Sequence, residues 1–452
     1  MNRTVLTKYG RVTGIPSAVP KFTVFKGIPY AKPPVGELRW RAPADPDRWE
    51  EPRLCDAFPP AGIQPAQEKG AFYEIEFFQA GYEVSEDCLY LNVWADLEKR
   101  NQPVMVWIHG GAYSHGFGHE MEFDGDVFAK RGVILVTINY RLGALGFMAH
   151  PALTERDGHS GNYGLMDQIA ALRWVRDNIR AFGGDESNVT IFGQSAGAGS
   201  VQVLMASPLA DGLFRRAIHM SAGSPLASLG GCPSQTDAEK TGIEMGECAG
   251  VGLDGLYEMD AMDILKCARS LKGGLRFRPC ADKYVLPEDP GRTFARGAAR
   301  DESFMLGSVT GDAGLFGGAI EDRDERAEAA TVALAKARIA QGKSGCYVYH
   351  FRRDVPGDDH PGAFHSSELW YMFGTLHRSD RPFSGLDYDL SLRMTDWWTN
   401  FARTGDPGEG FSAYTAESPA LMEIGEETGM VGIKERPLAD KISDEMIRNR
   451  NA

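Results

Sequence analysis

The chain has little that would place it in a membrane or on nucleic acid. No stretch approaches the run of about 18 apolar residues that a membrane span needs. Residues 1–10 lack the apolar segment of a signal peptide, so we expect a cytoplasmic protein. No basic block is present, and the formal net charge is -14 at pH 7. This charge disfavours nucleic acid and anionic membrane surfaces as partners and mildly disfavours anionic substrates.

Patterns that mark common cofactor and metal sites are also missing. The sequence contains no P-loop, no Gly-x-Gly-x-x-Gly after the first strand and no His-Glu-x-x-His. His109, His115 and His119 lie close together along the chain, but their spacing matches no common zinc site and their segment is rich in glycine. We therefore expect no cofactor and no metal.

The cysteines are odd in number and scattered, without a Cys-x-x-Cys pair. They indicate neither a disulfide framework nor a zinc site. Cys248 and Cys267 flank a predicted helical hairpin and could pair under oxidising conditions, but in a reducing compartment we expect thiols. The seven cysteines are Cys55, Cys88, Cys232, Cys248, Cys267, Cys280 and Cys346.

Signals for strands and helices alternate between residues 103 and 205. Apolar runs at 103–108, 132–139 and 188–192 predict buried strands, and apolar residues spaced by three and four predict a helix over 165–182. The alternation predicts an α/β fold, a largely parallel sheet with helices on its faces. Further strands are predicted at 86–94, 303–306 and 345–351, helices at 324–341 and 390–404, and one edge hairpin from the runs 6–13 and 22–25.

A chain of 452 residues can bury a large core, and we predict one domain with long excursions. Its core is expected at about 4–225 and 300–425. The less regular, helical segment at about 226–300 is expected to be a cap insertion over the mouth of the sheet, and a charged tail follows at 437–452.

A Gly-x-Ser-x-Gly motif joins the predicted strand at 188–192 to a helix that starts at Ala196. A serine on such a sharp turn is pushed out to where a base can reach it, and small residues such as Gly193 and Gly197 are needed on both sides. Ser195 is therefore predicted to be a nucleophile.

Three further segments fit acyl-transfer chemistry. His109-Gly-Gly-Ala-Tyr113 ends a buried strand and could be a plain glycine turn, but beside Gly-x-Ser-x-Gly it predicts backbone N–H groups that hold an oxyanion. Asp312 and His365 each follow a late predicted strand, in the order serine, acid, histidine. Alone, Asp312 would be a turn or cap residue and His365 would fill a polar niche; the order predicts an acid and a base, with Glu368 as the alternative acid.

Longer motifs accompany these residues, and with them the chain resembles the type-B carboxylesterase/lipase family of α/β-hydrolases from about residue 4 to 425. The resemblance implies an α/β-hydrolase fold, with a large mixed, mostly parallel sheet, helices on both faces and helical cap insertions. The motifs are Phe25-Lys-Gly-Ile-Pro-Tyr-Ala-Lys-Pro-Pro-Val-Gly, Glu86-Asp-Cys-Leu-Tyr-Leu-Asn-Val-Trp, Trp107-Ile-His-Gly-Gly-Ala, Gly161-Asn-Tyr-Gly-Leu-Met-Asp-Gln, Phe182-Gly-Gly-Asp, Gly193-Gln-Ser-Ala-Gly and Phe401-Ala-Arg-Thr-Gly-Asp-Pro.

The resemblance also implies roles for individual residues. Ser195 would be the nucleophile, His365 the base, and Asp312 the acid, where the family usually has Glu. The oxyanion-hole donors implied are Gly111, Ala112 and Ala196. We further expect six residues near the substrate pocket, with an aromatic core as the alternative reading: Tyr113, Phe117, Gln194, Leu315, Phe316 and Trp370.

Departures from the family pattern carry information. Gln194 stands where cholinesterases have Glu, and no Trp lies between Cys55 and Cys88, so a choline substrate is not expected. Gly62 stands where the family has the cysteine that pairs with the one at Cys88, so that disulfide is expected to be absent. The stretch from 312 to 365 is shorter than usual, which implies a trimmed cap and a more open pocket.

Together these features predict a serine carboxylesterase that hydrolyses small to medium neutral esters through an acyl-enzyme intermediate. The expected partner is a small-molecule ester. The same triad acting on an amide, carbamate, lactone or thioester is the alternative. A non-catalytic binding homologue is disfavoured because Ser195, His365 and the Gly-Gly-Ala loop are intact.

Overall fold

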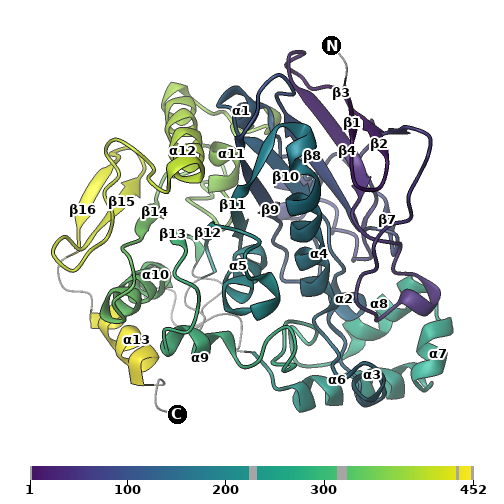
Figure 1. The fold of residues 1–452 in the computed structure, drawn as a ribbon. Coiled ribbons are helices and arrows are strands. Elements are labelled where there is room, and N and C mark those ends of the chain that lie inside the picture. The colour runs from purple at the N-terminus through teal and green to yellow at the C-terminus, as the bar shows by residue number, and fades with distance from the viewer. Residues whose placement is uncertain (1–2, 223–231, 313–322, 434–436, 449–452) are drawn as a thin grey trace.

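The computed structural model describes residues 3–222, 232–312, 323–433 and 437–448. Its centre is an 11-stranded sheet in the order β16-β15-β14-β13-β12-β11-β9-β10-β8-β4-β3 (Figure 1). The seven strands from β15 to β10 pair in parallel, and the strands at both edges pair antiparallel. The strands are β3 (Ile15–Pro16), β4 (Thr23–Pro29), β8 (Tyr90–Ala95), β9 (Gln102–Ile108), β10 (Ile134–Ile138), β11 (Gly184–Gln194), β12 (Arg216–Met220), β13 (Ser303–Val309), β14 (Tyr347–Phe351), β15 (Ala420–Ile424) and β16 (Gly429–Gly432).

Helices cover both faces of this sheet, so the α/β-hydrolase architecture expected from the sequence is confirmed. Short 3₁₀ segments lie at Gly36–Leu38, Ile179–Phe182, Pro208–Ala210 and Leu376–Arg378, and a π-helical turn at Glu74–Phe78. The α-helices are α1 (Asp126–Lys130), α2 (Gly143–Phe147), α3 (Pro151–Asp157), α4 (Tyr163–Asn178), α5 (Ala196–Ala206), α6 (Gln235–Ala249), α7 (Leu253–Glu258), α8 (Ala261–Ser270), α9 (Pro290–Ala295), α10 (Arg323–Ala340), α11 (Glu368–Met372), α12 (Gly385–Thr404) and α13 (Pro437–Arg448).

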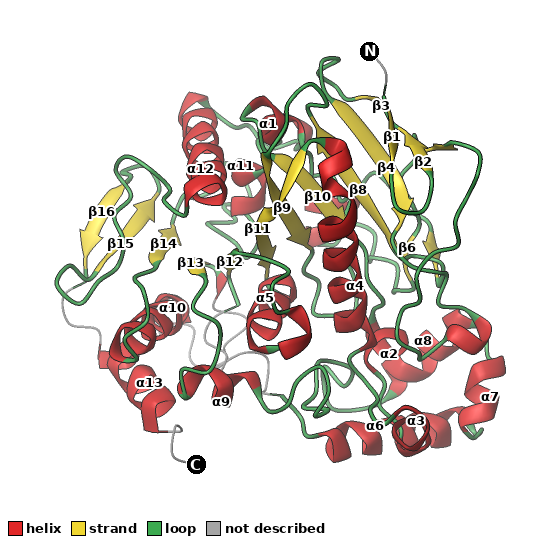
Figure 2. Cartoon of the chain, in the orientation of Figure 1, coloured by secondary structure: helices red, strands yellow, loops and turns green. Residues whose placement is uncertain are grey.

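Each face of the sheet has its own apolar core, because successive side chains of a strand point to opposite faces. On one face Val104 and Val106 of β9 pack in a cluster with residues of α4 and α5. On the other face Met105 and Trp107 pack in a cluster with residues of α1, α11 and α12. Figure 2 shows α4 and α5 in front of the central strands. All seven residues of β9 are buried, as expected for a central parallel strand.

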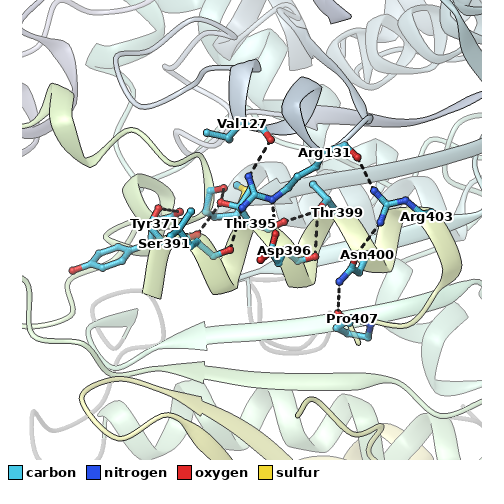
Figure 3. A network of polar contacts seen from close by, with 12 residues as sticks. Val127, Arg131, Tyr371, Ser391, Thr395, Asp396, Thr399, Asn400, Arg403 and Pro407 are labelled. Carbon is cyan, nitrogen blue, oxygen red and sulfur yellow. Dashed lines mark hydrogen bonds and ion pairs between the residues drawn. The ribbon is translucent and has the colours of Figure 1, made fainter. Parts of the chain in front are cut away.

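Helix α12 ties two other helices to the core (Figure 3). The Arg131 guanidinium, just past α1, pairs with Asp396 at 2.6 Å and donates to the Val127 carbonyl at 3.2 Å. The Ser391 hydroxyl donates to the Tyr371 carbonyl of α11 at 2.7 Å. Because α11 begins three residues after His365, these bonds help to hold the loop that carries this histidine.

The N-terminal segment corrects one expectation. The run 6–13 does not join the run 22–25 in a single hairpin; β1 (Thr4–Leu6) pairs with β2 (Arg11–Thr13) and both belong to a separate sheet with β5 (Arg53–Leu54). The chain turns within this run because the Thr7 amide and hydroxyl both donate to the Gly10 carbonyl, at 3.0 and 2.7 Å. A third sheet pairs β6 (Ala61–Gly62) with β7 (Val84–Ser85).

Strand β12 and helix α13 are among the elements that were not expected from the sequence. Strand β12 lies between β11 and β13 and is fully buried, but its sequence Arg-Ala-Ile-His-Met mixes polar and apolar residues and gives no strand pattern. Helix α13 lies in the charged C-terminal segment and is joined to α10 by an ion pair between Lys336 and Asp440. In both cases contacts with neighbouring elements stabilise a secondary structure that the local sequence pattern does not predict.

The described part of the segment 226–300 contains helices α6 to α9, of which α6, α7 and α8 lie with α2 and α3 at the lower right of Figure 1. Arg39, in the Pro/Gly-rich loop, joins this segment to the core: its guanidinium donates to the carbonyls of Leu256, Tyr257 and Met259 and pairs with Glu86. The role of this segment as a cap remains a prediction. In the ranges that the structure describes, no helix combines the length and the apolar character needed to cross a bilayer.

A buried ion pair connects the end of β10 to α4. The Arg141 guanidinium binds the Asp167 carboxylate through two bonds of 2.7 and 2.8 Å, and the Arg141 amide donates to it at 3.0 Å. Both side chains are almost completely buried. Each charge therefore depends on the other for neutralisation.

We expect Asp167→Ala to lower the free energy of unfolding by about 3 to 5 kcal/mol, because it leaves the Arg141 charge buried and unpaired. Urea unfolding followed by tryptophan fluorescence measures this change. The control is Asp237→Ala, which breaks an exposed pair with Lys240 and should shift the midpoint little. Equal shifts for the two variants would contradict the role of the buried pair.

Candidate active site

Ser195 lies on a strained turn between β11 and α5. Its backbone has φ 56° and ψ -124°, a region that L-residues seldom adopt. The Ser195 amide donates to the Met220 carbonyl of β12 at 2.9 Å, which helps to hold the turn. A Cβ at Gly193 would lie 2.5 Å from the Gly197 carbonyl carbon, and one at Gly197 would lie 2.0 Å from the Ile108 carbonyl oxygen. Close contact with β9 therefore requires both glycines.

A short bridge between two loops brings Asp312 to His365. The Gly311 amide donates to the Ala363 carbonyl at 2.7 Å, and Gly311 pairs with Phe364 as an isolated parallel bridge. His365 Nδ1 then lies 2.6 Å from Asp312 Oδ1. Asp312 Oδ2 accepts from the Val309 amide at 2.8 Å, so both carboxylate oxygens have partners. The Asp side chain, although one methylene shorter than Glu, reaches the imidazole.

Glu368 is a poor substitute for Asp312. It is completely buried, and its Oε1 accepts from the Ser221 hydroxyl at 3.3 Å. Burial, followed by the nearby negative charge of Asp312, raises the pKa of Glu368 to about 8. Glu368 is therefore largely protonated at neutral pH and lacks the charge that would stabilise a protonated His365.

Gln194 lies beside the histidine ring. Its Nε2 is 3.1 Å from His365 Nε2 and 3.3 Å from His365 Nδ1. Nε2 is the atom that must take a proton from a serine hydroxyl when Nδ1 is held by a carboxylate. The uncharged amide of Gln194 therefore contacts the His365 imidazole without placing a charge beside it.

The loop after β9 provides backbone N–H groups near Ser195. Gly111, Ala112 and Tyr113 have φ values of 94°, 53° and 57°, and the Gly143 amide fixes the loop by donating to the Tyr113 carbonyl at 2.7 Å. Ala196 is the first residue of α5, where N–H groups have no partner within the helix. The assignment of Gly111, Ala112 and Ala196 as oxyanion-hole donors fits this arrangement and remains a prediction.

Ser195 and His365 line a common cleft with a volume of about 390 Å³. Gly111, Ala112 and Gln194 line it too, and the Tyr73 hydroxyl donates to the His365 carbonyl at 3.1 Å. The sequence analysis did not predict the aromatic residues of this wall. The cluster of aromatic residues in the Glu-rich segment 72–78 was the signal that could have indicated them. The aromatic lining residues are Tyr73, Phe77, Phe78, Trp107 and Phe123.

Of the six residues expected near the pocket, Gln194 lines the cleft. Trp370 is buried behind it and stacks on Phe77, with ring centroids 5.5 Å apart. Tyr113 and Phe117 are buried against Phe147 and Tyr82 respectively. Leu315 and Phe316 lie outside the described residues.

The histidines and cysteines add no second centre to this site. In the described ranges no three His, Cys, Asp or Glu side chains are grouped so that they could hold a metal ion. His119 stacks on Phe58 instead. All seven cysteines are thiols, and Cys248 Sγ lies 3.0 Å from the Ser270 hydroxyl.

Comparison with known proteins identifies the family. The carboxylesterase family model matches residues 1–336 and, in a second match, 326–441. The chain belongs to the carboxylesterase family. It is a carboxylic-ester hydrolase of the type-B class, as expected from the sequence.

Similar proteins span nearly the whole of this carboxylesterase. Para-nitrobenzyl esterase of Bacillus subtilis (strain 168) is 36% identical over 94% of this chain and 94% of its own. Fumonisin B1 esterase of Sphingopyxis macrogoltabida is 34% identical over 90% of this chain and 83% of its own. A solved structure of PNB esterase superposes with a TM-score of 0.85 and 33% identity, covering 98% of this chain and 99% of that one.

We expect Gln194→Glu in this carboxylesterase to move the acid limb of the pH dependence of kcat/KM upward by about 1 pH unit. A carboxylate beside His365 stabilises the protonated imidazole, which cannot accept the serine proton. Activity at pH 6 should therefore fall relative to activity at pH 8. Gln79→Glu adds the same charge at an exposed position and should leave the profile in place; a shift as large as that of Gln194→Glu would contradict the local effect.

Proposed function

We propose that Ser195, His365 and Asp312 are the catalytic triad of this carboxylesterase and that its substrates are small to medium neutral esters. The observation that supports the triad most directly is the 2.6 Å contact between His365 Nδ1 and Asp312 Oδ1, in a cleft that also holds Ser195. The order of the three residues along the chain is the one typical of this fold.

The reaction proceeds in two steps through an acyl-enzyme. His365 Nε2 takes the Ser195 proton while Oγ attacks the ester carbonyl, and Asp312 holds the tautomer and stabilises the imidazolium. The N–H groups of Gly111, Ala112 and Ala196 stabilise the oxyanion. The imidazolium then protonates the leaving alcohol. A water that gives its proton to His365 attacks the acyl-enzyme, and collapse of the second oxyanion returns that proton to Ser195 and releases the acid.

The cleft supports the proposed substrate size. A volume of about 390 Å³ lies near the lower end for small-molecule pockets, and its aromatic wall favours apolar acyl or alcohol groups. Such a wall excludes water from the reacting atoms and strengthens the interactions that stabilise the oxyanion.

The proposed compartment is the cytoplasm. All seven cysteines are thiols, including Cys55, Cys88 and Cys280, which are buried. Buried thiols without disulfides are typical of proteins in reducing surroundings.

Hydrolysis of p-nitrophenyl esters from acetate to dodecanoate tests the proposed function. We expect a Ser195-dependent rate that is highest for short to medium acyl chains, because the cleft has limited volume. Ser195→Ala, assayed in parallel, gives the background. A maximum at the longest chains would contradict the proposed size class, and rates equal to the background on every ester would contradict ester hydrolysis through Ser195.

The choice of acid is tested by removing the charge of each buried carboxyl separately. Asp312→Asn should lower kcat by about 10⁴-fold, because an amide favours the wrong imidazole tautomer. Glu368→Gln should lower kcat by less than about tenfold, since Glu368 is already protonated near neutral pH. Single-turnover acylation measures both effects, and the reverse order would assign the role of the acid to Glu368.

A further inference from the structure

Two segments that are far apart in the chain line the catalytic cleft and are joined to each other. The aromatic turn, residues 72–78, comes before β8 and supplies Tyr73, Phe77 and Phe78 to the cleft wall. The histidine loop, residues 352–366, runs from β14 toward α11 and carries His365. The proposed reaction gives no role to the contacts that join the two segments.

A buried ion pair fixes the aromatic turn on the histidine loop. Arg381, which lies shortly before α12, donates through Nε to the two carboxylate oxygens of Glu76 at 2.9 and 3.0 Å. The two side chains are 9% and 5% exposed. The Arg381 guanidinium also donates to the Pro356 carbonyl at 3.1 Å and pairs with Asp359 at 3.0 Å. One guanidinium therefore connects a residue of the turn with two residues of the loop.

Phe364, the residue before His365, packs against the rings of the aromatic turn. Its ring lies edge-to-face on those of Phe72 and Tyr73, with centroids 4.8 and 6.4 Å away. The centroid of Phe77 lies 6.3 Å away. Edge-to-face pairs of aromatic rings are stabilised beyond the area that they bury. The backbone that leads into His365 is thus held against the turn.

Tyr73 reaches the backbone on the other side of the histidine. Its hydroxyl donates to the His365 carbonyl at 3.1 Å. Partial burial, followed by the charge of Asp312, raises the pKa of Tyr73 to about 12, so the hydroxyl keeps its proton near neutral pH. The next residue of the loop, Ser366, has φ 82°, which L-residues seldom adopt. Such a conformation persists only where the surrounding structure holds it, and the Tyr73 hydroxyl holds the peptide that leads into it.

We propose that Tyr73 is a positioning residue for His365. The ion pair between Glu76 and Arg381 acts through Tyr73, because it fixes the aromatic turn on the histidine loop. The bond to the carbonyl restrains the peptide that follows the histidine, so the imidazole keeps its place between the acid and the serine. This role rests on the proposed function, in which His365 is the base. Tyr73 itself transfers no proton.

Single-turnover acylation by p-nitrophenyl butyrate, with the enzyme in excess, separates positioning from binding. The limiting rate constant at saturating enzyme reports acylation, and the enzyme concentration at half-saturation reports binding of the ester. Tyr73→Phe removes the hydroxyl and keeps the ring in the cleft wall. We expect the limiting rate constant to fall by about 3- to 10-fold, as for the loss of one neutral hydrogen bond, while the half-saturation concentration changes less than about twofold.

Tyr82→Phe is the matched control. In the described ranges the Tyr82 ring contacts Phe78 and Phe117, with centroids 6.1 and 4.6 Å away, and these residues lie outside the histidine loop. Loss of this hydroxyl should leave the limiting rate constant within about twofold of the wild type. An equal fall for the two tyrosine variants would assign the effect to the aromatic cluster as a whole and would overturn the positioning role.

A double-mutant cycle tests the ion pair. Glu76→Gln weakens the anchor of the aromatic turn, and we expect it to lower the limiting rate constant about as much as Tyr73→Phe does. In the Tyr73→Phe background the same change should lower it less than about twofold, because the hydroxyl that restrains His365 is already absent. Losses that multiply would show that the ion pair acts independently of Tyr73 and would overturn its proposed route.

Tyr73→Phe keeps the proposal falsifiable if Glu76→Gln does not fold, because Tyr73 is 40% exposed and loses a single hydroxyl. A limiting rate constant within about twofold of the wild type would overturn the positioning role while leaving ester hydrolysis established. Absence of Ser195-dependent acylation by the wild type, judged against Ser195→Ala, would instead overturn the proposed function and the positioning role with it.

Discussion

The parallel order of the central strands is the constraint on which the rest of this carboxylesterase depends. β9, β11, β13 and β14 run in the same direction, so the loops at their carboxyl ends open at one edge of the sheet. Those loops carry Gly111, Ser195, Asp312 and His365, which are distant in sequence. β12 lies between β11 and β13, and its Met220 carbonyl accepts a hydrogen bond from the Ser195 amide. The strand with no clear sequence pattern therefore supports the turn of the Gly-x-Ser-x-Gly motif.

Close backbone contacts convert this arrangement into a defined geometry. At Gly197 the chain passes so near the end of β9 that even a methyl group would clash with the Ile108 carbonyl. At Gly311 a Cβ would lie 2.6 Å from the Ala363 carbonyl oxygen, in the bridge that brings Asp312 to His365. The strain at Ser195 is tolerated because the surrounding strands are fully buried and closely packed.

Environment gives the carboxyl groups of one cleft different properties. Asp312 contacts an imidazole and a backbone amide, whereas burial keeps Glu368 protonated only a short distance away. Glu120 and Glu122 border the same cleft, and burial raises the pKa of both carboxyl groups. Side chains of one chemical type can thus contact an imidazole or be buried with a raised pKa, according to their neighbours and their solvent access.

The sequence by itself determined the features that depend on short-range pattern: the sharp turn at Ser195, the buried strands at 103–108 and 132–139, and the helices that alternate with them. Such features follow from glycine geometry and from the spacing of apolar residues. The motifs of the family were enough to predict the α/β-hydrolase fold and ester hydrolysis. The alternation of strands and helices implied a parallel sheet, and with it one edge of the sheet at which the loops that carry these residues lie.

Only the tertiary structure decided which distant groups meet. The separate N-terminal sheet depends on a turn at Thr7, and strand β12 and helix α13 depend on neighbours that no local pattern describes. The same holds for the different surroundings of Asp312 and Glu368, which lie on either side of the histidine in sequence: Asp312 contacts His365, whereas burial raises the pKa of Glu368. Desolvation and long-range hydrogen bonds set these outcomes, and both arise only when segments far apart in the chain pack together.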